Sequence, residues 1–196
     1  VIVKTSLRVC EELNISVDER KIIDQIGLPL LTTGELFLGK GQGQKYFDTY
    51  QKYFYELLAE GIEVFDGIKD LLRELKDNGQ QLAIVTSKSR RSADASIEMA
   101  GLRSFFELTV TVNDDCGHKP SPDPALYALK KLGAHAENSI FVGDSPFDIL
   151  CAKSAGCLAC GVLWGAGSRE QLQDSGADFI AADVDELRDY LLNKIK

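Results

Sequence analysis

The sequence has no run of apolar residues long enough to span a bilayer and no signal-peptide pattern. Basic residues are also in short supply, because 22 Lys and Arg stand against 30 Asp and Glu, which gives a formal net charge of -8. Sequence-independent nucleic-acid binding requires clustered Lys and Arg side chains. We therefore expect a soluble protein that has neither a membrane nor a nucleic acid as its partner.

Cysteine is scarce, and its number is odd. The five residues are Cys10, Cys116, Cys151, Cys157 and Cys160. A disulfide framework of the secreted kind uses an even set of cysteines, whereas unpaired thiols are typical of a reducing compartment. The sequence therefore predicts free thiols and a cytoplasmic location.

The residues that are abundant indicate a globular protein. Hydrophobic residues make up 44% of the 196 positions and charged residues 27%, as in ordinary folded domains. This length suffices for one domain, or for one domain that carries an insertion.

From about Gly61 onward, short apolar runs alternate with amphipathic helical stretches. The runs are residues 82–85, 108–112, 140–142, 158–163 and 179–181. Leu71 and Leu75 belong to one helical stripe, and Leu126, Leu129 and Leu132 form another. Several helices are predicted to stop at a glycine, as at Gly133 and Gly156. Alternating strands and helices predict an α/β fold: a Rossmann-like parallel sheet with helices on both faces.

Residues 1–60 differ, because they show helical periodicity without any strand. Val3, Leu7 and Cys10 share one helical face, and Ser16 with Glu19 has the spacing of a capping box for a second helix. We predict a helical cap domain over residues 1–60 and an α/β core over residues 61–196.

Polar residues follow three of the predicted strands where each strand ends. The first ends in Thr86-Ser-Lys88, the second leads to Lys119, and the third ends in Gly143-Asp-Ser-Pro-Phe-Asp148. Ligands of open parallel sheets bind beyond these carboxyl ends. A hydroxyl with free amides at a strand-to-helix turn suits a phosphate group, and carboxylates suit Mg²⁺. Lys119 beside them would neutralise phosphoryl charge.

Each of these signals also has an ordinary structural interpretation. Thr86-Ser can simply cap a helix, and the prolines after Lys119 can simply form a turn and a helix start. Asp144 and Asp148 can be a cap and a solvated residue. The occurrence of all of them in order, at consecutive strand ends, favours the functional interpretation.

These phrases resemble motifs two, three and four of the haloacid dehalogenase (HAD) superfamily. Ile84-Val-Thr-Ser-Lys88, His118-Lys-Pro-Ser-Pro-Asp123 and Val142-Gly-Asp-Ser-Pro-Phe-Asp-Ile149 are similar to its phosphoglycolate phosphatase and PpaX-type pyrophosphatase branch. The helical residues 1–60 resemble the inserted cap of that branch, where the cap selects the substrate. On this basis Lys40, Lys45 and Tyr46 are candidates for substrate selection.

The resemblance implies a role for each matching residue. Thr86 would donate its hydroxyl to the transferring phosphoryl group, aided by the amides of Ser87 and Lys88. Lys119 would stabilise charge on the phosphoryl oxygens and on the nucleophile.

The resemblance also implies a metal site. Asp144 would bind Mg²⁺. Asp148 would support either Lys119 or the outer shell of the metal.

The family's first motif, Asp-x-Asp-Gly-Thr, has no match in this sequence. Its first Asp attacks phosphorus and its second acts as general acid and base. The resemblance places the strand that carries it between the strands that end at Thr86 and Gly143. We expect its absence to leave a cavity that Leu82, Ile84, Ile140 and Val142 line.

Truncation of the sequence would explain the absence of this motif. The free energy lost with the missing strand can be estimated. We expect the biological chain to carry roughly 10–25 further N-terminal residues, from a strand of ~5–6 residues plus its loop. Each unsatisfied backbone group costs about 1–3 kcal/mol against a net stability of ~5–15 kcal/mol. The printed chain is then expected to fold poorly and to be inactive.

The leading hypothesis is a Mg²⁺-dependent phosphatase that hydrolyses a small phosphomonoester such as phosphoglycolate through an aspartyl-phosphate. The alternatives on the same fold are a pyrophosphatase and a phosphosugar mutase. From another class, the alternative is a non-catalytic HAD-like binding protein. The expected partner is a small phosphorylated metabolite, and the protein is expected to be a monomer or a homodimer.

Overall fold

The strands of this computed structural model, which describes residues 1–194, form two separate parallel sheets. The strands are β1 (Ala83–Val85), β2 (Leu108–Val110), β3 (Ile140–Gly143), β4 (Leu158–Val162) and β5 (Phe179–Ala181). β1 pairs with β2, and β3, β4 and β5 pair in that order. The five predicted strands and their parallel pairing are confirmed.

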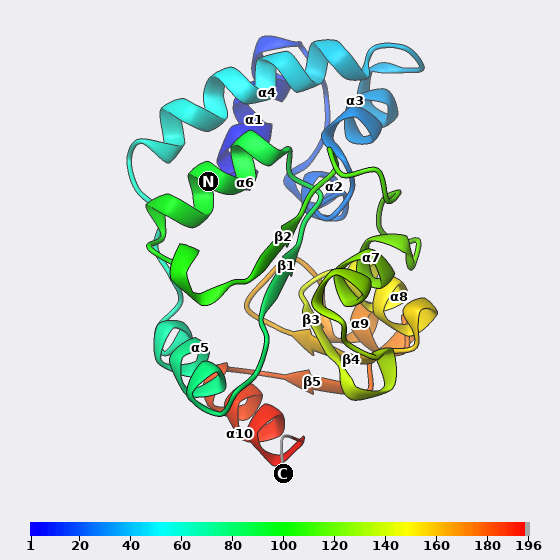
Figure 1. The fold of residues 1–196 in the computed structure, drawn as a ribbon. Helices are drawn as coiled ribbons and strands as arrows, with labels where there is room; N and C mark the ends of the chain where they lie inside the picture. Colours follow the sequence, from blue (N-terminus) through cyan, green and yellow to red (C-terminus); the bar gives the residue numbers. More distant parts are fainter. Residues whose placement is uncertain (195–196) are drawn as a thin grey trace.

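Helices cover both faces of the three-stranded sheet (Figure 1). They are α5 (Ile68–Asp77), α7 (Asp123–Leu132), α8 (Pro146–Ala155), α9 (Arg169–Asp174) and α10 (Val184–Lys194). The remaining helix, α6 (Arg90–Met99), follows β1, and its Ala95 packs instead on the buried cluster of the N-terminal helices. On β4, Ala159 packs into a buried cluster with α7, α8 and α9, whereas Cys160 and Val162 pack with α5 and α10. This alternation arises because successive side chains of a strand point to opposite faces, and it makes β4 the most deeply buried strand.

The helix ends follow the sequence in some places and depart from it in others. Gly133 and Gly156 end α7 and α8 in the left-handed conformation, at φ 66° and 82°, as predicted. The predicted capping box of Ser16 and Glu19 is wrong. Asp18 is the N-cap residue, and its carboxylate accepts a hydrogen bond from the Lys21 amide, because the helix begins at Glu19 itself.

Four helices precede the α/β part and lie together above it in Figure 1. They are α1 (Ile2–Glu12), α2 (Glu19–Ile23), α3 (Leu30–Leu38) and α4 (Gly43–Leu58). Val9, Tyr50 and Phe54 are among the side chains of their shared buried cluster. The helical character of residues 1–60 is confirmed, whereas the division into two domains at residue 60 stays a prediction.

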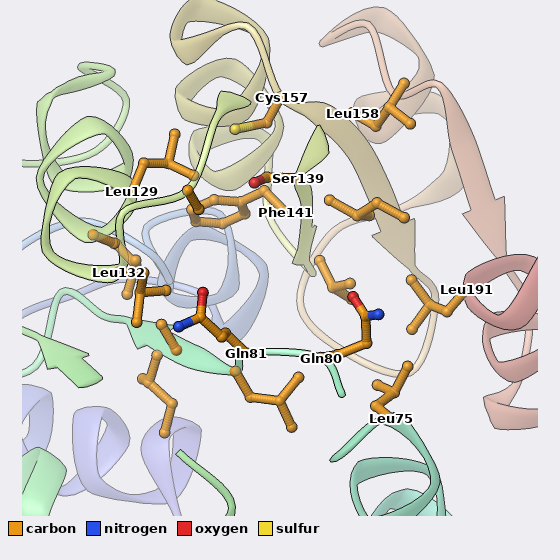
Figure 2. Close-up of a pocket in the computed structure, with 18 of the residues that line it drawn as sticks. Leu75, Gln80, Gln81, Leu129, Leu132, Ser139, Phe141, Cys157, Leu158 and Leu191 are labelled. Atoms are coloured by element: carbon orange, nitrogen blue, oxygen red, sulfur yellow. The ribbon is translucent and has the colours of Figure 1, made fainter. Parts of the chain in front are cut away.

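An apolar cavity of about 760 Å³ separates β1 from β3. Leu82, Ile84, Ile140 and Val142 line it, as the sequence predicts. Figure 2 shows leucine side chains directed into this space from opposite sides, with Gln80 and Gln81 between them. We call this cavity the slot; it splits the expected single sheet in two.

Within residues 1–194, no helix combines the length and the apolar character needed to cross a bilayer.

Candidate active site

A second cavity, of about 330 Å³, lies at the carboxyl ends of β1 and β3. We call it the site cavity. All six residues that the sequence singled out line it: Thr86, Ser87, Lys88, Lys119, Asp144 and Asp148. The structure therefore brings the predicted set together, although the catalytic role of each residue stays a prediction.

Lys119 and Asp148 form a buried ion pair at the base of the site cavity. Lys119 Nζ lies 2.6 Å from Asp148 Oδ1, and only 8% and 7% of the two side chains are exposed. The other carboxylate oxygen of Asp148 accepts hydrogen bonds from the Ser145 amide at 3.1 Å and from the Ser145 hydroxyl at 2.6 Å. Both oxygens of Asp148 are therefore engaged, which favours support of Lys119 over direct binding of a metal.

The Ser145–Asp148 contacts are also the capping box of α8. Ser145 Oγ accepts from the Asp148 amide, and the Asp148 carboxylate accepts from the Ser145 amide. Ordinary helix-start chemistry thus fixes the carboxylate that holds Lys119. Ser145 was not among the predicted site residues, although the spacing Ser-x-x-Asp is the signal that could have identified it.

Asp144 is held by the loop that follows β4. Its Oδ2 accepts a hydrogen bond from the Ala166 amide at 2.8 Å, and its backbone carbonyl accepts from the Gly167 amide at 2.7 Å. A Cβ on Gly165 would lie 2.2 Å from Asp144 Oδ2, so the loop can approach only with glycine there. Burial, and then the nearby charge of Asp148, raises the pKa of Asp144. A cation beside it would reverse this effect.

The turn after β1 places the Thr86 hydroxyl and the Lys88 ammonium group at the site cavity. The Thr86 amide pairs with the Val110 carbonyl at 2.9 Å, and Thr86 Oγ1 accepts from the Lys88 amide at 3.2 Å. Lys88 Nζ lies 4.7 Å from the centroid of the Phe54 ring of α4, a cation–π distance. Burial lowers the pKa of Lys88 to about 8.

The segment between α2 and α3 covers the site cavity. Ser87 Oγ donates a hydrogen bond to the Gly27 carbonyl at 2.5 Å. A Cβ on Gly27 would lie 2.7 Å from Ser145 Oγ, and the φ of 110° at this residue also favours glycine. The helical part therefore touches the α/β part directly at the site, through residues that sequence analysis did not single out.

The residues proposed for substrate selection lie elsewhere. Tyr46 is fully buried among the helices, where burial raises its pKa to about 12. Lys40 and Lys45 are exposed, and none of the three lines the site cavity. That prediction is wrong, because the inner faces of α3 and α4 pack on each other. Ile22, Gln25 and Leu28 line the site cavity instead.

One carboxylate of the site is available to bind a metal. Asp144 uses one oxygen for the Ala166 amide, whereas Asp148 is paired with Lys119. Within residues 1–194 there is no group of three or more His, Cys, Asp or Glu side chains arranged to hold an ion. The residues fit Mg²⁺ as a largely hydrated ion that is shared with a substrate phosphate, a common arrangement for this metal.

Comparison with known proteins identifies the family. Residues 1–162 match the model of the haloacid dehalogenase-like hydrolases. The chain belongs to this family. A protein of Caldanaerobacter subterraneus subsp. tengcongensis with the name "Putative pyrophosphatase PpaX" is 32% identical over 188 residues, which are 95% of this chain and 85% of the relative.

Two further HAD relatives extend the likeness. Pyrophosphatase PpaX of Oceanobacillus iheyensis is 27% identical over 90% of this chain and 82% of its own length. The crystal structure of a predicted phosphatase from Clostridium acetobutylicum matches with a TM-score of 0.86 at 28% identity, over 98% of this chain and 90% of the other. The HAD-like α/β fold is thereby established, as are hydrolases and phosphatases among its relatives.

Proposed function

We propose that this chain provides the phosphate-binding and metal-binding residues of a Mg²⁺-dependent HAD phosphatase that acts on a small phosphorylated metabolite. The observation that carries the proposal is the single site cavity that all six motif residues line. It lies at the carboxyl ends of parallel strands, the usual ligand position in such sheets.

The donors of the site suit a phosphoryl group. The Thr86 hydroxyl and the amides that follow it lie at a strand-to-helix turn, where anions are bound well. Lys119 keeps its position because Asp148 holds it from the other side, so its ammonium group needs no reorganisation when charge develops on the substrate. Lys88 adds a second ammonium group at the wall nearest Phe54.

The charge of the site cavity supports a metal requirement. Its charged side chains are two lysines, Lys88 and Lys119, and two aspartates, Asp144 and Asp148, which cancel formally. A phosphate dianion buried there would lack compensation. Asp144 would bind Mg²⁺, with Asp148 acting through Lys119, and bound Mg²⁺ would draw negative charge from the phosphoryl oxygens.

The covalent step of the proposed reaction is attack by an aspartate carboxylate on phosphorus, which gives an aspartyl-phosphate. Both carboxylates of the site cavity already have other roles in the proposal. We therefore expect the chain as printed to bind its substrate without turnover.

Besides the phosphosugar mutase alternative, which stays a prediction, two substrate classes carry a second anionic group that could face Lys88. One is a phosphomonoester that bears a carboxylate, such as phosphoglycolate. The other is pyrophosphate, which the names of the PpaX relatives favour. The residues around Lys88 and the segment between α2 and α3 would discriminate between these two substrates.

Calorimetric titration tests the proposal. Pyrophosphate, phosphoglycolate and ethyl phosphate would be titrated with and without Mg²⁺ into wild type, Thr86→Val and Asp144→Asn, with exposed Lys40→Met as the control. We expect Mg²⁺-dependent binding that Asp144→Asn weakens at least about tenfold, the loss of about one charged contact. Equal binding with and without Mg²⁺ would contradict the proposed metal site. Equal binding by Thr86→Val and wild type would contradict the proposed phosphate site.

The proposed setting is the cytoplasm, with a small phosphorylated metabolite as the partner. All five cysteines are free thiols, and four of them are buried, which suits a reducing compartment. Whether the protein is a monomer or a homodimer would be read from sedimentation velocity.

A further inference from the structure

One short segment covers the site cavity from the side of the N-terminal helices. We call residues 24–28, which follow α2, the cover. Gln25 and Leu28 of the cover line the site cavity, and the Gly27 carbonyl accepts a hydrogen bond from Ser87 Oγ at 2.5 Å. This bond holds the inner end of the cover at the turn that follows β1.

The outer end of the cover is joined to α9 by a closed ring of three side chains. Arg20 Nη2 donates to Gln171 Oε1 at 3.2 Å, and Gln171 Nε2 donates to Asp24 Oδ1, also at 3.2 Å. Arg20 Nε lies 3.2 Å from the same oxygen of Asp24. Asp24 and Gln171 are 147 positions apart in the sequence, so this ring is a tertiary contact. We call it the clasp.

Gln171 also belongs to the loop that holds Asp144. Its Oε1 accepts from the Ser168 amide at 2.9 Å, which is part of the capping box of α9. The two residues before Ser168 bind Asp144 through their amides, Ala166 at Oδ2 and Gly167 at the backbone carbonyl. The side chain of Gln171 therefore contacts the cover and also fixes the end of the loop around Asp144.

The clasp lies at the surface, where its strength is modest. The side chains of Arg20 and Asp24 are 57% and 36% exposed. Exposed ion pairs contribute little singly and more when several groups form a network. A contact of this kind can open and close as ligands exchange, whereas a buried pair such as Lys119 with Asp148 separates only at high cost.

We propose that Gln171 is a positioning residue of the site, which holds the cover over the site cavity through the clasp and links the cover to the loop around Asp144. Mg²⁺ on Asp144 would order this loop, and an ordered loop presents Gln171 to the cover. Binding of the metal and closure of the cover then favour each other. The link to Mg²⁺ rests on the proposed function, whereas the clasp itself needs no metal.

Amide hydrogen exchange without any metal tests the clasp. The amides of Ile26 and Leu28 donate to carbonyls within residues 23–25 at 2.9 and 3.2 Å, so their exchange reports how often the cover opens. Arg20→Met breaks the clasp from the side of α2. Lys21→Met removes the same charge from the next residue, which is exposed, and it is the matched control.

We expect Arg20→Met to speed the exchange of these two amides by about two- to fivefold, the effect of an exposed charged contact. Lys21→Met should leave their exchange as in wild type, and exchange at Cys160 in β4 should be the same in all three proteins, because the change is local. Equal exchange of the cover in wild type and Arg20→Met would overturn the proposal.

A second pair of variants separates the clasp from the capping box of α9. Gln171→Ala loses both, whereas Ser168→Ala loses the capping hydroxyl and keeps the Gln171 side chain. We expect only Gln171→Ala to speed the exchange of the cover. Equal effects of the two variants would assign the contact to the stability of α9 alone and would also overturn the proposal.

Mg²⁺ added alone tests the link to Asp144. We expect a saturating concentration, established by calorimetry, to slow the exchange of the cover about twofold in wild type and in Lys21→Met, and to have no effect in Gln171→Ala. Bound Mg²⁺ that leaves the cover of wild type unchanged would overturn the link. Failure of Mg²⁺ to bind would contradict the proposed function instead, and the metal-free exchange would still decide whether the clasp holds the cover.

Discussion

The ion pair of Lys119 and Asp148 is short and almost fully buried. Its nitrogen and oxygen lie 2.6 Å apart in a region from which water is nearly excluded. Separating such a pair costs more than the pair contributes, because the remaining charge stays buried without compensation. The pair therefore holds the Lys119 ammonium group in place, but replacing either residue alone is expected to destabilise the protein.

We expect Asp148→Asn to lower the free energy of unfolding by about 3–5 kcal/mol. Adding Lys119→Met should restore part of this loss, since no unpaired charge then remains. Urea denaturation of both single variants and the double variant gives the coupling. Asp70→Asn, which removes a largely exposed pair with Arg73, is the control and should change the midpoint little. Additive losses would contradict the predicted coupling.

Lys88 is expected to make both the stability and the anion binding of the protein depend on pH. Burial lowers its pKa from 10.5 to about 8, so its charge is lost above that pH in the folded protein. Between about pH 8 and 10.5 the unfolded chain binds the extra proton, so the contribution of Lys88 to the free energy of unfolding rises with pH. Anion binding should show the opposite trend, because it depends on the charge.

We expect sulfate, which does not itself titrate in this range, to bind about tenfold more weakly as the pH rises through 8. Lys119, Asp144 and Asp148 share the cavity with Lys88, so Lys88→Met is the necessary reference and should show a flatter profile. Calorimetry at several pH values makes the measurement. A wild-type profile parallel to that of Lys88→Met would assign the titration to another group.

At the scale of elements, a helix cap positions side chains of the candidate site. α8 and α9 both begin with a complete capping box, from Ser145 with Asp148 and from Ser168 with Gln171. Of these four residues only Asp148 lines the site cavity, and it also belongs to the buried ion pair with Lys119. Comparing substitutions in the two capping boxes therefore distinguishes the loss of stability from removing a helix cap from the additional loss caused by disturbing the buried ion pair.

We expect Ser168→Ala to cost about 1 kcal/mol, the usual value for a cap. Ser145→Ala should cost more, about 2–4 kcal/mol, because the buried Asp148 carboxylate also loses a donor. Chemical denaturation compares the two variants. Equal losses would show that the hydroxyl of Ser145 acts only as a cap and does not support the pair of Asp148 and Lys119.

At the scale of the whole molecule, the strands differ in whether one or both of their edges are paired. β4 has partners on both edges and a buried cluster on each face. β1 and β3 each have one partner and border the slot. Local stability follows such differences in pairing and burial.

We expect the amides of Cys160 and Gly161 in β4 to exchange hydrogen most slowly among the strand amides, and those of Ala83 and Val85 in β1 to exchange fast. Exchange measured by NMR on the wild-type protein alone would show it. The interior amide of α4 at Tyr50, in the separate helical cluster, provides an internal reference. Uniform protection of β1 and β4 would mean that the slot is already closed in solution.

The alternation of short apolar runs with amphipathic helices determined the parallel α/β fold, since both signals are local and depend on period alone. The order of Thr86, Lys119 and Asp144 along the chain was likewise sufficient to place them at one rim, because the carboxyl ends of parallel strands meet at the same edge. The cavity between β1 and β3 also followed, from the resemblance of the motifs to the HAD family.

Only the tertiary structure decided which neighbours act on these residues. The Gly27 carbonyl over Ser87, the Ala166 amide on Asp144 and the ring of Phe54 beside Lys88 come from segments far away in the sequence. Packing also turned Tyr46 inward, against the prediction. Such contacts depend on how elements meet in space, and no local pattern records that.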